Sequence, residues 1–358
     1  MVESTYLAGD LGGTKTLLSV YGDCGGHLQP LFSRRYLSGE WRCLEDMLHQ
    51  FLRDVPCEHP KPITSCIAVA GPVNNGNAKL TNLPWTLSNE ALVAATGLDR
   101  LELVNDFAVL IHGLPHFDQQ QQVTLQVAKT DQATSANNNP GPVAILGAGT
   151  GLGMARGIPT PMTPHWVALA SEGGHREFAP RTTDEWDLAS WLKADLDIDR
   201  LSIERIVSGT GLGHVMRWRL QHHDGAGHPL QGAADAWRTR TMDEDGYVDL
   251  PALVGEAAQQ GDALARSALD LWLGAYGSVA GDLALQELCT GGLWIGGGTA
   301  AKQLSGLQSA TFLEPMRRKG RFRPFLESIT VRAVIDPNAG LFSAACRARD
   351  LAAGVAAS

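Results

Sequence analysis

Continuous apolar runs mark the candidate strands of this chain. Each run is short, is rich in β-branched residues, and ends at glycine or at another turn-forming residue, as buried strands do. The chain is expected to form strands at residues 5–8, 16–21, 63–70, 101–104, 142–146, 154–156 and 293–295.

Between these runs, apolar residues recur three or four positions apart, which predicts amphipathic helices. The predicted helices cover residues 44–52, 183–194, 263–285 and 340–353, although three glycines weaken the third. In the second helix, four side chains are expected to face inward: Trp186, Leu188, Trp191 and Leu192. Strands that alternate with helices indicate the α/β class, and a length of 358 residues allows two domains of ordinary size.

Two glycine-rich turns lie at matching places in two pairs of predicted strands. Residues 9–15 read Gly-Asp-Leu-Gly-Gly-Thr-Lys, and residues 147–153 read Gly-Ala-Gly-Thr-Gly-Leu-Gly. A backbone that wraps around phosphate oxygens needs residues without Cβ, both for close approach and for positive φ. One such turn is explained equally well as a hairpin that requires glycine, but the recurrence indicates phosphate binding and a short internal repeat. Neither run is a Walker P-loop or a G-x-G-x-x-G turn that enters a helix.

Several polar side chains near these turns are candidates for chemistry. Thr14 supplies a hydroxyl donor, and Asp10 is placed to hold Mg²⁺, directly or through water. Asn105 and Asp106 end an apolar strand, where a carboxylate can accept a proton from a substrate hydroxyl. Taken alone, an Asn-Asp pair after a strand is more often a turn or a helix N-cap.

Two further groups of residues could bind a polyol. Glu172 and His175 flank two glycines and could present an acceptor and a donor, although an exposed turn explains them as well. Glu204 lies in an apolar run before the sequence Ser-Gly-Thr-Gly; a lone glutamate is normally solvated, so a functional role depends on its neighbours.

Composition and charge exclude several classes of protein. Apolar residues make up 44% and aromatic residues 6%, which is typical of an α/β protein rather than a disordered or fibrous one. The formal net charge of −9, without a local basic stripe, argues against nucleic acid or an anionic membrane as a partner. It does not argue against ATP, because backbone N–H groups and a metal ion can bind phosphate.

The cysteines, the N-terminus and the histidines add expectations about compartment and exposure. The six cysteines are scattered without a C-x-x-C pair, so we expect reduced thiols rather than a zinc site. The N-terminus has neither a basic start nor a long apolar core, so we expect no signal peptide and a cytoplasmic protein. Four histidines in loop-like sequence are expected to be solvated: His214, His222, His223 and His228.

Taken in order, these and other motifs resemble the bacterial glucokinase family of the sugar-kinase/actin superfamily. The resemblance runs nearly end to end, and the order and spacing are more specific than any single motif. The motifs are residues 9–15, 70–73, 81–85, 104–107, 147–153, 172–175, 178–180, 203–209, 291–298, 319–322 and 336–341. The related repressor/open-reading-frame/kinase family carries a cysteine-rich zinc motif, whereas no cysteine lies here between Cys66 and Cys289, which disfavours that family.

The resemblance implies an α/β, two-lobed actin-like ATPase (hexokinase-type) fold, with ribonuclease-H-like sheets in both lobes and a cleft between them. It implies a small lobe of residues 1–115, completed by a C-terminal helix at about residues 340–358, and a large lobe of residues 116–339. The implied activity is transfer of the γ-phosphoryl group of ATP to the 6-hydroxyl of glucose, with ATP and Mg²⁺ as cofactors. A cytoplasmic homodimer with no nucleic-acid or membrane partner is also implied.

The resemblance further implies the site residues, with Asp106 as the general base. Glucose would be bound by Asn105, Asp106, Glu172, His175 and Glu204. ATP would be bound by Gly9, Asp10, Leu11, Gly12, Gly13, Thr14, Gly149, Thr150, Gly151, Gly297 and Gly298, with Asp10 holding Mg²⁺ through water. Two alternatives stay open: a kinase for another hexose, and a non-catalytic sugar-binding regulator on the same fold.

Overall fold

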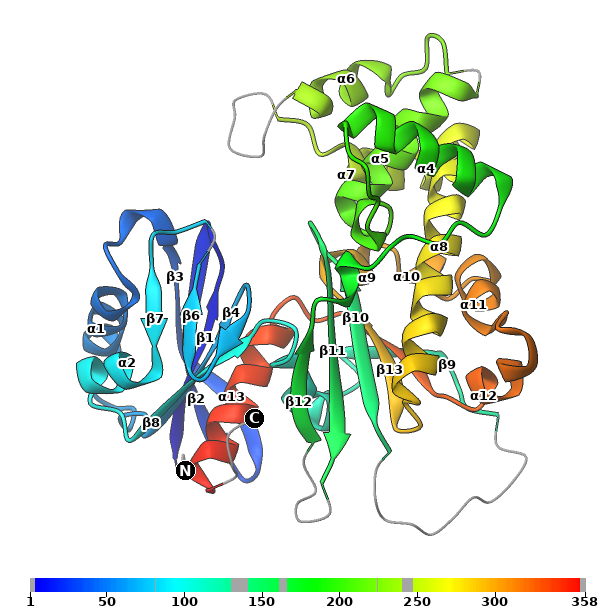
Figure 1. Ribbon diagram of the computed structural model, residues 1–358. Coiled ribbons are helices and arrows are strands. Elements are labelled where there is room, and N and C mark those ends of the chain that lie inside the picture. Colours follow the sequence, from blue (N-terminus) through cyan, green and yellow to red (C-terminus); the bar gives the residue numbers. More distant parts are fainter. Residues whose placement is uncertain are drawn as a thin grey trace. The chain divides into compact units, whose positions relative to one another are not determined.

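The computed structural model describes residues 4–80, 82–129, 141–160, 166–223, 225–239 and 247–354 (Figure 1). The chain forms two compact units. The first comprises residues 1–121, 155–170 and 336–358, and the second comprises residues 122–154 and 171–335. Each unit has its own sheet and its own hydrophobic core, which makes the protein α/β as the sequence predicted.

The first unit is built on a five-stranded sheet with the strand order β3-β2-β1-β4-β8. These strands are β1 (Thr5–Leu11), β2 (Lys15–Cys24), β3 (His27–Leu37), β4 (Thr64–Val69) and β8 (Arg100–Asn105). A separate three-stranded sheet contains β5 (Val73–Asn74), β6 (Asn77–Lys79) and β7 (Thr86–Ser88). The helices of this unit are η1 (Ser38–Glu40), α1 (Leu44–Asp54), α2 (Asn89–Thr96), α3 (Leu110–Gly113), η2 (Leu114–His116) and α13 (Ala339–Ala352).

Two helices cover the central strands of the first sheet. The buried residues of α1 are Leu44, Met47, Leu48 and Phe51, a spacing that places all four on one helical face against the core. The C-terminal helix α13, red in Figure 1, packs against β1 and β4. It is tied to β8 by the buried ion pair between Arg347 Nε and Glu102 Oε2 at 2.6 Å. Residues from the two ends of the sequence therefore share one core.

The second unit contains most of a six-stranded sheet with the order β12-β11-β10-β13-β14-β9, although residues 155–170, in β11 and β12, are assigned to the first unit. These strands are β9 (Gln122–Gln126), β10 (Val143–Ala148), β11 (Leu152–Pro159), β12 (Trp166–Ser171), β13 (Gly292–Gly296) and β14 (Val331–Val334). The helices are η3 (Gly173–His175), α4 (Thr183–Leu196), η4 (Ile203–Arg205), α5 (Gly209–His222), α6 (Gln231–Thr239), α7 (Leu250–Gln259), α8 (Ala263–Glu287), α9 (Gly298–Lys302), α10 (Leu304–Leu307), α11 (Ala310–Arg317), η5 (Gly320–Phe322) and α12 (Arg323–Glu327).

The two sheets share one plan of construction. In the first, β1 pairs with β4 and β4 with β8, both in parallel, and β2 lies on the other side of β1. In the second, β10 pairs with β13 and β13 with β14, again in parallel, and β11 lies on the other side of β10. The internal repeat that the two glycine-rich turns predicted therefore extends to the topology of both sheets.

Trp186, one of the four residues of α4 that were predicted to face inward, faces outward instead. In α4, Leu188 and Leu192 are fully buried and Trp191 is half-buried, but the side chain of Trp186 is 62% exposed. Residues 188, 191 and 192 follow the spacing of one helical face, whereas residue 186 lies two positions before residue 188 and so points to nearly the opposite side.

The long helix α8 contains glycines because the backbone of α11 lies against it. A Cβ at Gly277 would lie 2.0 Å from the carbonyl oxygen of Phe312, and a Cβ at Gly281 would lie 2.2 Å from that of Met316. The helix, yellow in Figure 1, contains glycines despite their poor helical propensity, because only they allow α11 to pack this closely against it.

Gly277→Ala is expected to lower the free energy of unfolding by about 1–3 kcal/mol, because the added methyl group would force α8 and α11 apart. Gly274→Ala is the matched control on the same helix, since its Cβ would meet only the end of the Arg181 side chain, at 3.0 Å. Urea denaturation measures both variants. Equal stability of the two would contradict this explanation of the α8 glycines.

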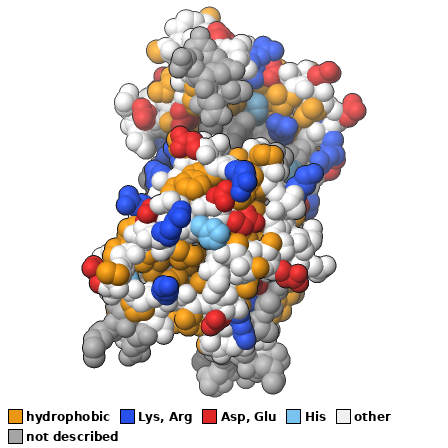
Figure 2. All heavy atoms as spheres, turned by 90° about the vertical axis from the view of Figure 1, so that its left-hand side faces the viewer, with side chains coloured by type: hydrophobic (Ala, Val, Ile, Leu, Met, Phe, Trp, Pro, Cys, Tyr) orange, Lys and Arg blue, Asp and Glu red, His pale blue; other side chains and the backbone are white. Residues whose placement is uncertain are grey.

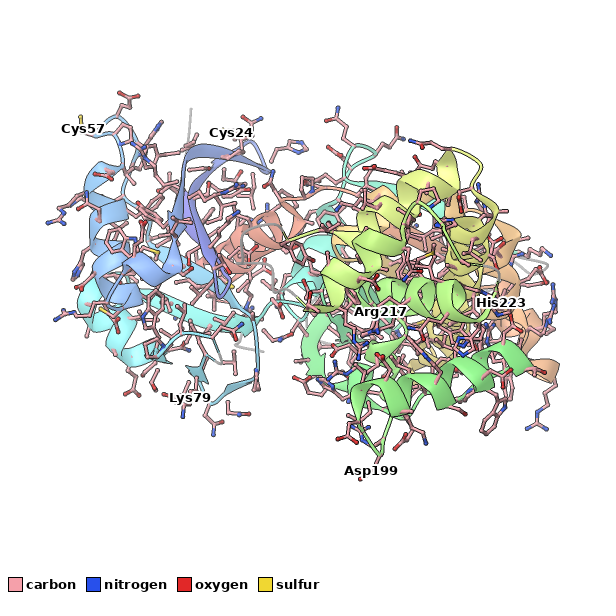
Figure 3. The ribbon with its side chains drawn as sticks, turned by 90° about the horizontal axis from the view of Figure 1, so that it is seen from above. Cys24, Cys57, Lys79, Asp199, Arg217 and His223 are labelled. Atoms are coloured by element: carbon pink, nitrogen blue, oxygen red, sulfur yellow. The ribbon has the colours of Figure 1, made fainter. Side chains whose placement is uncertain are left out.

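The prediction that all four histidines are solvated is wrong for His214, and also for His228, whose side chain is only 11% exposed and lies 3.0 Å from the Asp262 carboxylate. His214 lies in α5, is 5% exposed, and packs edge-on against the ring of Trp237 at a centroid distance of 5.3 Å. Burial lowers the pKa of His214 to about 4, and the positive charges of Arg217 and Arg205 act in the same direction, against Asp195. Arg217, labelled in Figure 3, is itself held by two 2.8 Å hydrogen bonds to the carboxylate of Asp195.

The neutral His214 makes stability depend on pH. The unfolded chain takes up the proton near pH 6.5 and the folded chain only near pH 4. The contribution of neutral His214 to the free energy of unfolding is therefore fully present above pH 6.5. It is lost as the pH falls from 6.5 to 4, and the loss amounts to up to about 3 kcal/mol. His214→Leu is expected to flatten the curve of unfolding free energy against pH in this window. An unchanged slope in urea titrations would contradict the assignment.

The surface and the cysteines carry no feature that changes this architecture. All six cysteines are free thiols, and Cys24 and Cys57 lie on separate segments in Figure 3. On the face of the first unit seen in Figure 2, acidic and basic side chains are interspersed. Among the described residues, no helix has both the length and the apolar character needed to cross a membrane.

Candidate active site

The first glycine-rich turn joins β1 to β2 in the first unit. Leu11 and Thr16 form the last pair of the hairpin, and the Gly12 N–H donates to the Lys15 carbonyl at 3.0 Å. A Cβ at Gly13 would lie 2.9 Å from the Cβ of Asn82. Neither Gly12 nor Gly13 has a positive φ, so the predicted need for positive φ is wrong. What requires glycine here is the close approach of other atoms.

A buried serine that sequence reasoning missed holds this turn in place. Ser38 Oγ donates to the Gly12 carbonyl at 2.9 Å and lies 2.9 Å from Thr16 Oγ1. The Ser38 N–H donates to the Thr14 carbonyl at 2.9 Å, and both hydroxyl-bearing residues, Ser38 and Thr16, are fully buried. No local sequence signal reveals this contact, because a single serine more than twenty residues away has no pattern to recognise.

Asp10 is the penultimate residue of β1 and is half-buried. Burial raises the pKa of this carboxyl above its usual value. Its side chain accepts no hydrogen bond from any residue that the structure describes, and the Cβ position of Gly340 in α13 lies 3.6 Å from Oδ2. A half-buried, acceptor-only group without a donor fits a cation or its water shell. No cluster of three or more His, Cys, Asp or Glu side chains occurs among the described residues, so further ligands for Mg²⁺ would come from phosphate and water.

Asn105 and Asp106 follow β8 at the same edge of the first sheet. The strand register aligns Leu11 with Val69, and Val69 with Asn105. Because carboxyl ends of parallel strands meet at one edge, the structure brings the first turn and Asp106 to the same edge. The Asp106 N–H donates to the Val69 carbonyl at 3.0 Å, which fixes its backbone.

The side chain of Asn105 is occupied within the protein. Its Oδ1 accepts from the N–H groups of Phe107 and Ala108, both at 3.0 Å, so it stabilises the turn after β8, whereas the N-cap of α3 is Val109. Its Nδ2 donates to the Gly71 carbonyl at 3.1 Å and to Asp106 Oδ1 at 3.0 Å. In this arrangement Asn105 orients the carboxylate of Asp106.

The second glycine-rich turn joins β10 to β11 in the second unit. The Gly149 N–H donates to the Gly151 carbonyl at 2.8 Å, and the start of α5 lies against it through the bond from Gly209 N–H to the Gly149 carbonyl at 2.7 Å. A Cβ at Gly149 would meet nothing within 4 Å, and its φ is not positive. Neither packing nor a positive φ requires this glycine, and its bare backbone leaves open space at the turn.

The chain at Gly297–Gly298 lies beside the second turn. Gly297 has φ of +80°, and a Cβ there would lie 2.6 Å from the Ala148 carbonyl oxygen. The hydroxyl of Thr299 donates to the same carbonyl at 2.8 Å. Gly298 resembles Gly149: a Cβ there would meet nothing within 4 Å.

Glu204 lies directly under the second turn. Its Oε2 accepts from the Leu152 N–H at 2.9 Å, and a Cβ at Gly151 would lie 2.5 Å from the same oxygen. The Ser208 hydroxyl, which caps α5, donates to the Glu204 carbonyl at 2.7 Å. The glutamate therefore supports the second glycine-rich turn, a role that the sequence did not indicate, and it is also a candidate sugar ligand.

Glu172 and His175 lie on the single turn η3 in the second unit. Both side chains are exposed, and His175 Nε2 is 3.7 Å from Glu172 Oε2. The backbone of the turn packs tightly against Leu152 at Gly174. A Cβ at Gly174 would lie only 2.3 Å from the Leu152 carbonyl oxygen. Leu152 thus links η3 to Glu204, and the structure brings Glu172, His175, Glu204 and the second turn together in one unit.

A pocket of about 510 Å³ opens at the second turn and lies entirely within the second unit. Gly149, Thr150, Gly209, Thr210 and Gly298 line one part of it. The remaining lining comes from α5, α6, α8, α7 with the residues just before it, and the chain around α9: Leu212, Trp237, Trp272, Tyr247, Asp249, Pro251, Ala252, Gly255, Glu256, Gln259, Thr299, Lys302 and Gln303. The volume is in the range of small-molecule sites.

Comparison with known proteins gives a consistent result over the whole chain. The glucokinase family model matches residues 7–351. A glucokinase of Trichormus variabilis is 39% identical over 349 residues, which cover 96% of this chain and 98% of the relative. The crystal structure of a glucokinase from an Antarctic psychrotroph is 27% identical, with a TM-score of 0.76 over 97% of this chain and 99% of that one.

A more distant structure agrees in fold. It is a ROK family glucokinase from Streptomyces griseus in complex with glucose and AMPPNP, 21% identical, with a TM-score of 0.58 over 97% of this chain and 100% of that one. The fold predicted from the motifs, that of the two-lobed actin-like sugar kinases, is confirmed by these neighbours.

Proposed function

The chain belongs to the glucokinase family and is a glucose-phosphorylating enzyme, and we propose that it transfers the γ-phosphoryl group of ATP to the 6-hydroxyl of glucose. The observation that carries the nucleotide part is the pair Gly149 and Gly298. Both line one pocket, and neither has a steric or conformational reason within the fold to lack a side chain. Such bare backbone supports close approach of phosphate oxygens.

In the proposed mechanism, Asp106 accepts the proton of the 6-hydroxyl as that oxygen attacks the γ-phosphorus. The carboxylate is oriented for this by the Asn105 amide and by the backbone bond to Val69. Glu172, His175 and Glu204 bind the other hydroxyls, and the two glycine-rich turns position the phosphates. Most of the rate enhancement then comes from positioning and from charge stabilisation by fixed N–H groups.

Magnesium is the cation we propose for this site, with Asp10 as the residue that would hold it. The half-buried carboxylate has no protein donor among the described residues, which supports this assignment. When bound, Mg²⁺ supplies neutralisation of phosphate charge. A cytoplasmic homodimer is part of the same proposal and follows from the family resemblance. Sedimentation equilibrium of the purified chain tests the dimer.

The decisive experiment couples product formation to glucose-6-phosphate dehydrogenase, with ATP and Mg²⁺ and, in parallel, a panel of hexoses followed by ADP release. Glucose is expected to give the highest kcat/KM. A higher kcat/KM for another hexose would replace glucose as the substrate. Sugar binding in calorimetry without any ADP release would instead indicate the non-catalytic regulator.

A further inference from the structure

A second pocket, of about 1040 Å³, lies within the first unit. Its lining comes from Trp41, from the second half of α1, from the chain of residues 55–62 that leads to β4, and from the end of α2. None of the residues proposed to bind glucose, ATP or Mg²⁺ is among those that line it. Its volume is at the upper end of the range of small-molecule sites, so a ligand of that size fits it.

Part of the lining is apolar. Pro62 and Leu98 are buried, and Trp41 and Leu52 are half-buried. The indole of Trp41 packs edge-on against the ring of Tyr36, at a centroid distance of 5.3 Å. An aromatic ring among aliphatic side chains suits the apolar part of a small molecule.

Two exposed cations, Arg53 and Lys61, line the same pocket. Neither forms an ion pair with a carboxylate in the described part of the chain, and Arg53 Nη2 donates to the neutral amide of Gln50 at 2.9 Å. Asp46 is the single carboxylate among the lining residues, and it is already paired with Arg42 at 3.1 Å. Because the whole chain carries a net charge of −9, this local excess of positive charge favours an anionic ligand.

The apolar lining of this pocket is connected to the first glycine-rich turn. The Trp41 N–H donates to the Ser38 carbonyl at 3.2 Å, and the Ser38 hydroxyl donates to the Gly12 carbonyl at 2.9 Å. Tyr36, on which Trp41 packs, is the cross-strand partner of Thr16 at the end of the same turn. A ligand that displaces Trp41 therefore acts on the turn through two direct contacts.

We propose that this pocket binds a small organic anion and that its occupancy changes the affinity of the first glycine-rich turn for phosphate. The anionic head, a carboxylate or a phosphate, lies between Arg53 and Lys61, and the apolar ring or chain packs on Trp41. The binding is independent of the proposed activity, whereas the coupling rests on the proposed role of this turn in holding nucleotide phosphates.

Calorimetric titration of the full chain with four probes tests the binding. Phenyl phosphate and benzoate combine an anionic head with an apolar ring, inorganic phosphate has the head alone, and benzyl alcohol has the ring alone. At least one combined probe is expected to bind about tenfold more tightly than either half, and the tighter of the two identifies the head group.

Lys61→Glu is expected to weaken this binding at least about tenfold, because a carboxylate then faces the anion. Lys79→Glu is the matched control, since it makes the same change of charge at an exposed lysine of β6, outside the pocket but in the same unit (Figure 3). The affinity of this control for the tighter probe should stay within about twofold of wild type.

Cys57 reports whether the pocket is occupied. Its thiol is exposed and lines the pocket, and the residue is labelled in Figure 3. The tighter probe at saturation is expected to slow alkylation of Cys57 by iodoacetamide, followed by peptide mass spectrometry. Alkylation of Cys24, which does not line the pocket, should proceed at an unchanged rate.

Steady-state kinetics with glucose and ATP test the coupling. With the probe at saturation, the KM for ATP is expected to change by more than about twofold in the wild type and to stay unchanged in Lys61→Glu. This comparison separates an effect through the pocket from direct competition with ATP. An equal change in both proteins, or no change in the wild type, would contradict the coupling.

The remaining outcomes separate this inference from the proposed function. Binding that is no tighter than that of the separate halves, that persists in Lys61→Glu, or that leaves Cys57 unprotected would overturn the site. If the wild-type chain phosphorylates no hexose but the probe protects Cys57, and Lys61→Glu abolishes this protection, the site stands and the proposed activity fails.

Discussion

Asp106→Asn is expected to lower kcat by about 10²–10⁴-fold, the usual contribution of a general base. The replacement keeps the size of the side chain and the oxygen that accepts from Asn105 Nδ2, so the local backbone should not move. ADP affinity should therefore stay near that of wild type, and glucose should still bind. Steady-state kinetics with glucose and ATP, together with calorimetry for ADP, measure both effects.

Asn105→Asp provides a companion test with a readout in the pH profile. The new carboxylate keeps the oxygen that accepts from the N–H groups of Phe107 and Ala108 but loses the amide that donates to Asp106. Two adjacent carboxylates oppose each other's ionisation, which raises the pKa of Asp106 in this variant. The acidic limb of kcat/KM should move to higher pH. Asp106 would not be the general base if Asp106→Asn kept the kcat of wild type, or if the acidic limb of kcat/KM did not move in Asn105→Asp.

The sequence predicted the α/β class, and each of the seven strands and four helices that it predicted is present in the structure, because their signals are local. The apolar run at residues 63–70 became β4, and the spacing of residues 44–52 became α1. The errors have equally physical causes. The exposed Trp186 was placed inward because apolar character was counted without its helical angle, and His214 was placed in a loop because two glycines and polar neighbours hid an α-helix.

The residues of the candidate site likewise fall into those that the sequence predicted and those that it missed. Motifs with fixed spacing led to the two glycine-rich turns and to Asp106, whose edge of the sheet follows from the topology. Ser38, which hydrogen-bonds to the first turn, was missed because its contact with that turn exists only in three dimensions.

Glu204 is the second position at which a large effect is expected, and two replacements should separate its two roles. Glu204→Gln keeps an oxygen for the Leu152 N–H and loses the charge. It should raise the KM for glucose by one to two orders of magnitude, from a loss of about 1.5–3 kcal/mol in charge-assisted hydrogen bonding, and leave the KM for ATP nearly unchanged. Glu204→Ala also removes the support beneath Gly151, so it should raise the KM for ATP as well.

A double-mutant cycle with Gly151→Ala tests the support directly. In the wild-type background the new Cβ would lie 2.5 Å from Glu204 Oε2 and must push the carboxylate away, which should impair both substrates. In the Glu204→Ala background that oxygen is gone, so the same methyl group should cost much less. The two changes should therefore be non-additive in kcat/KM, as expected of residues in contact. Strict additivity would show that Glu204 and the phosphate turn act independently, and the KM for ATP of Glu204→Ala should then equal that of Glu204→Gln.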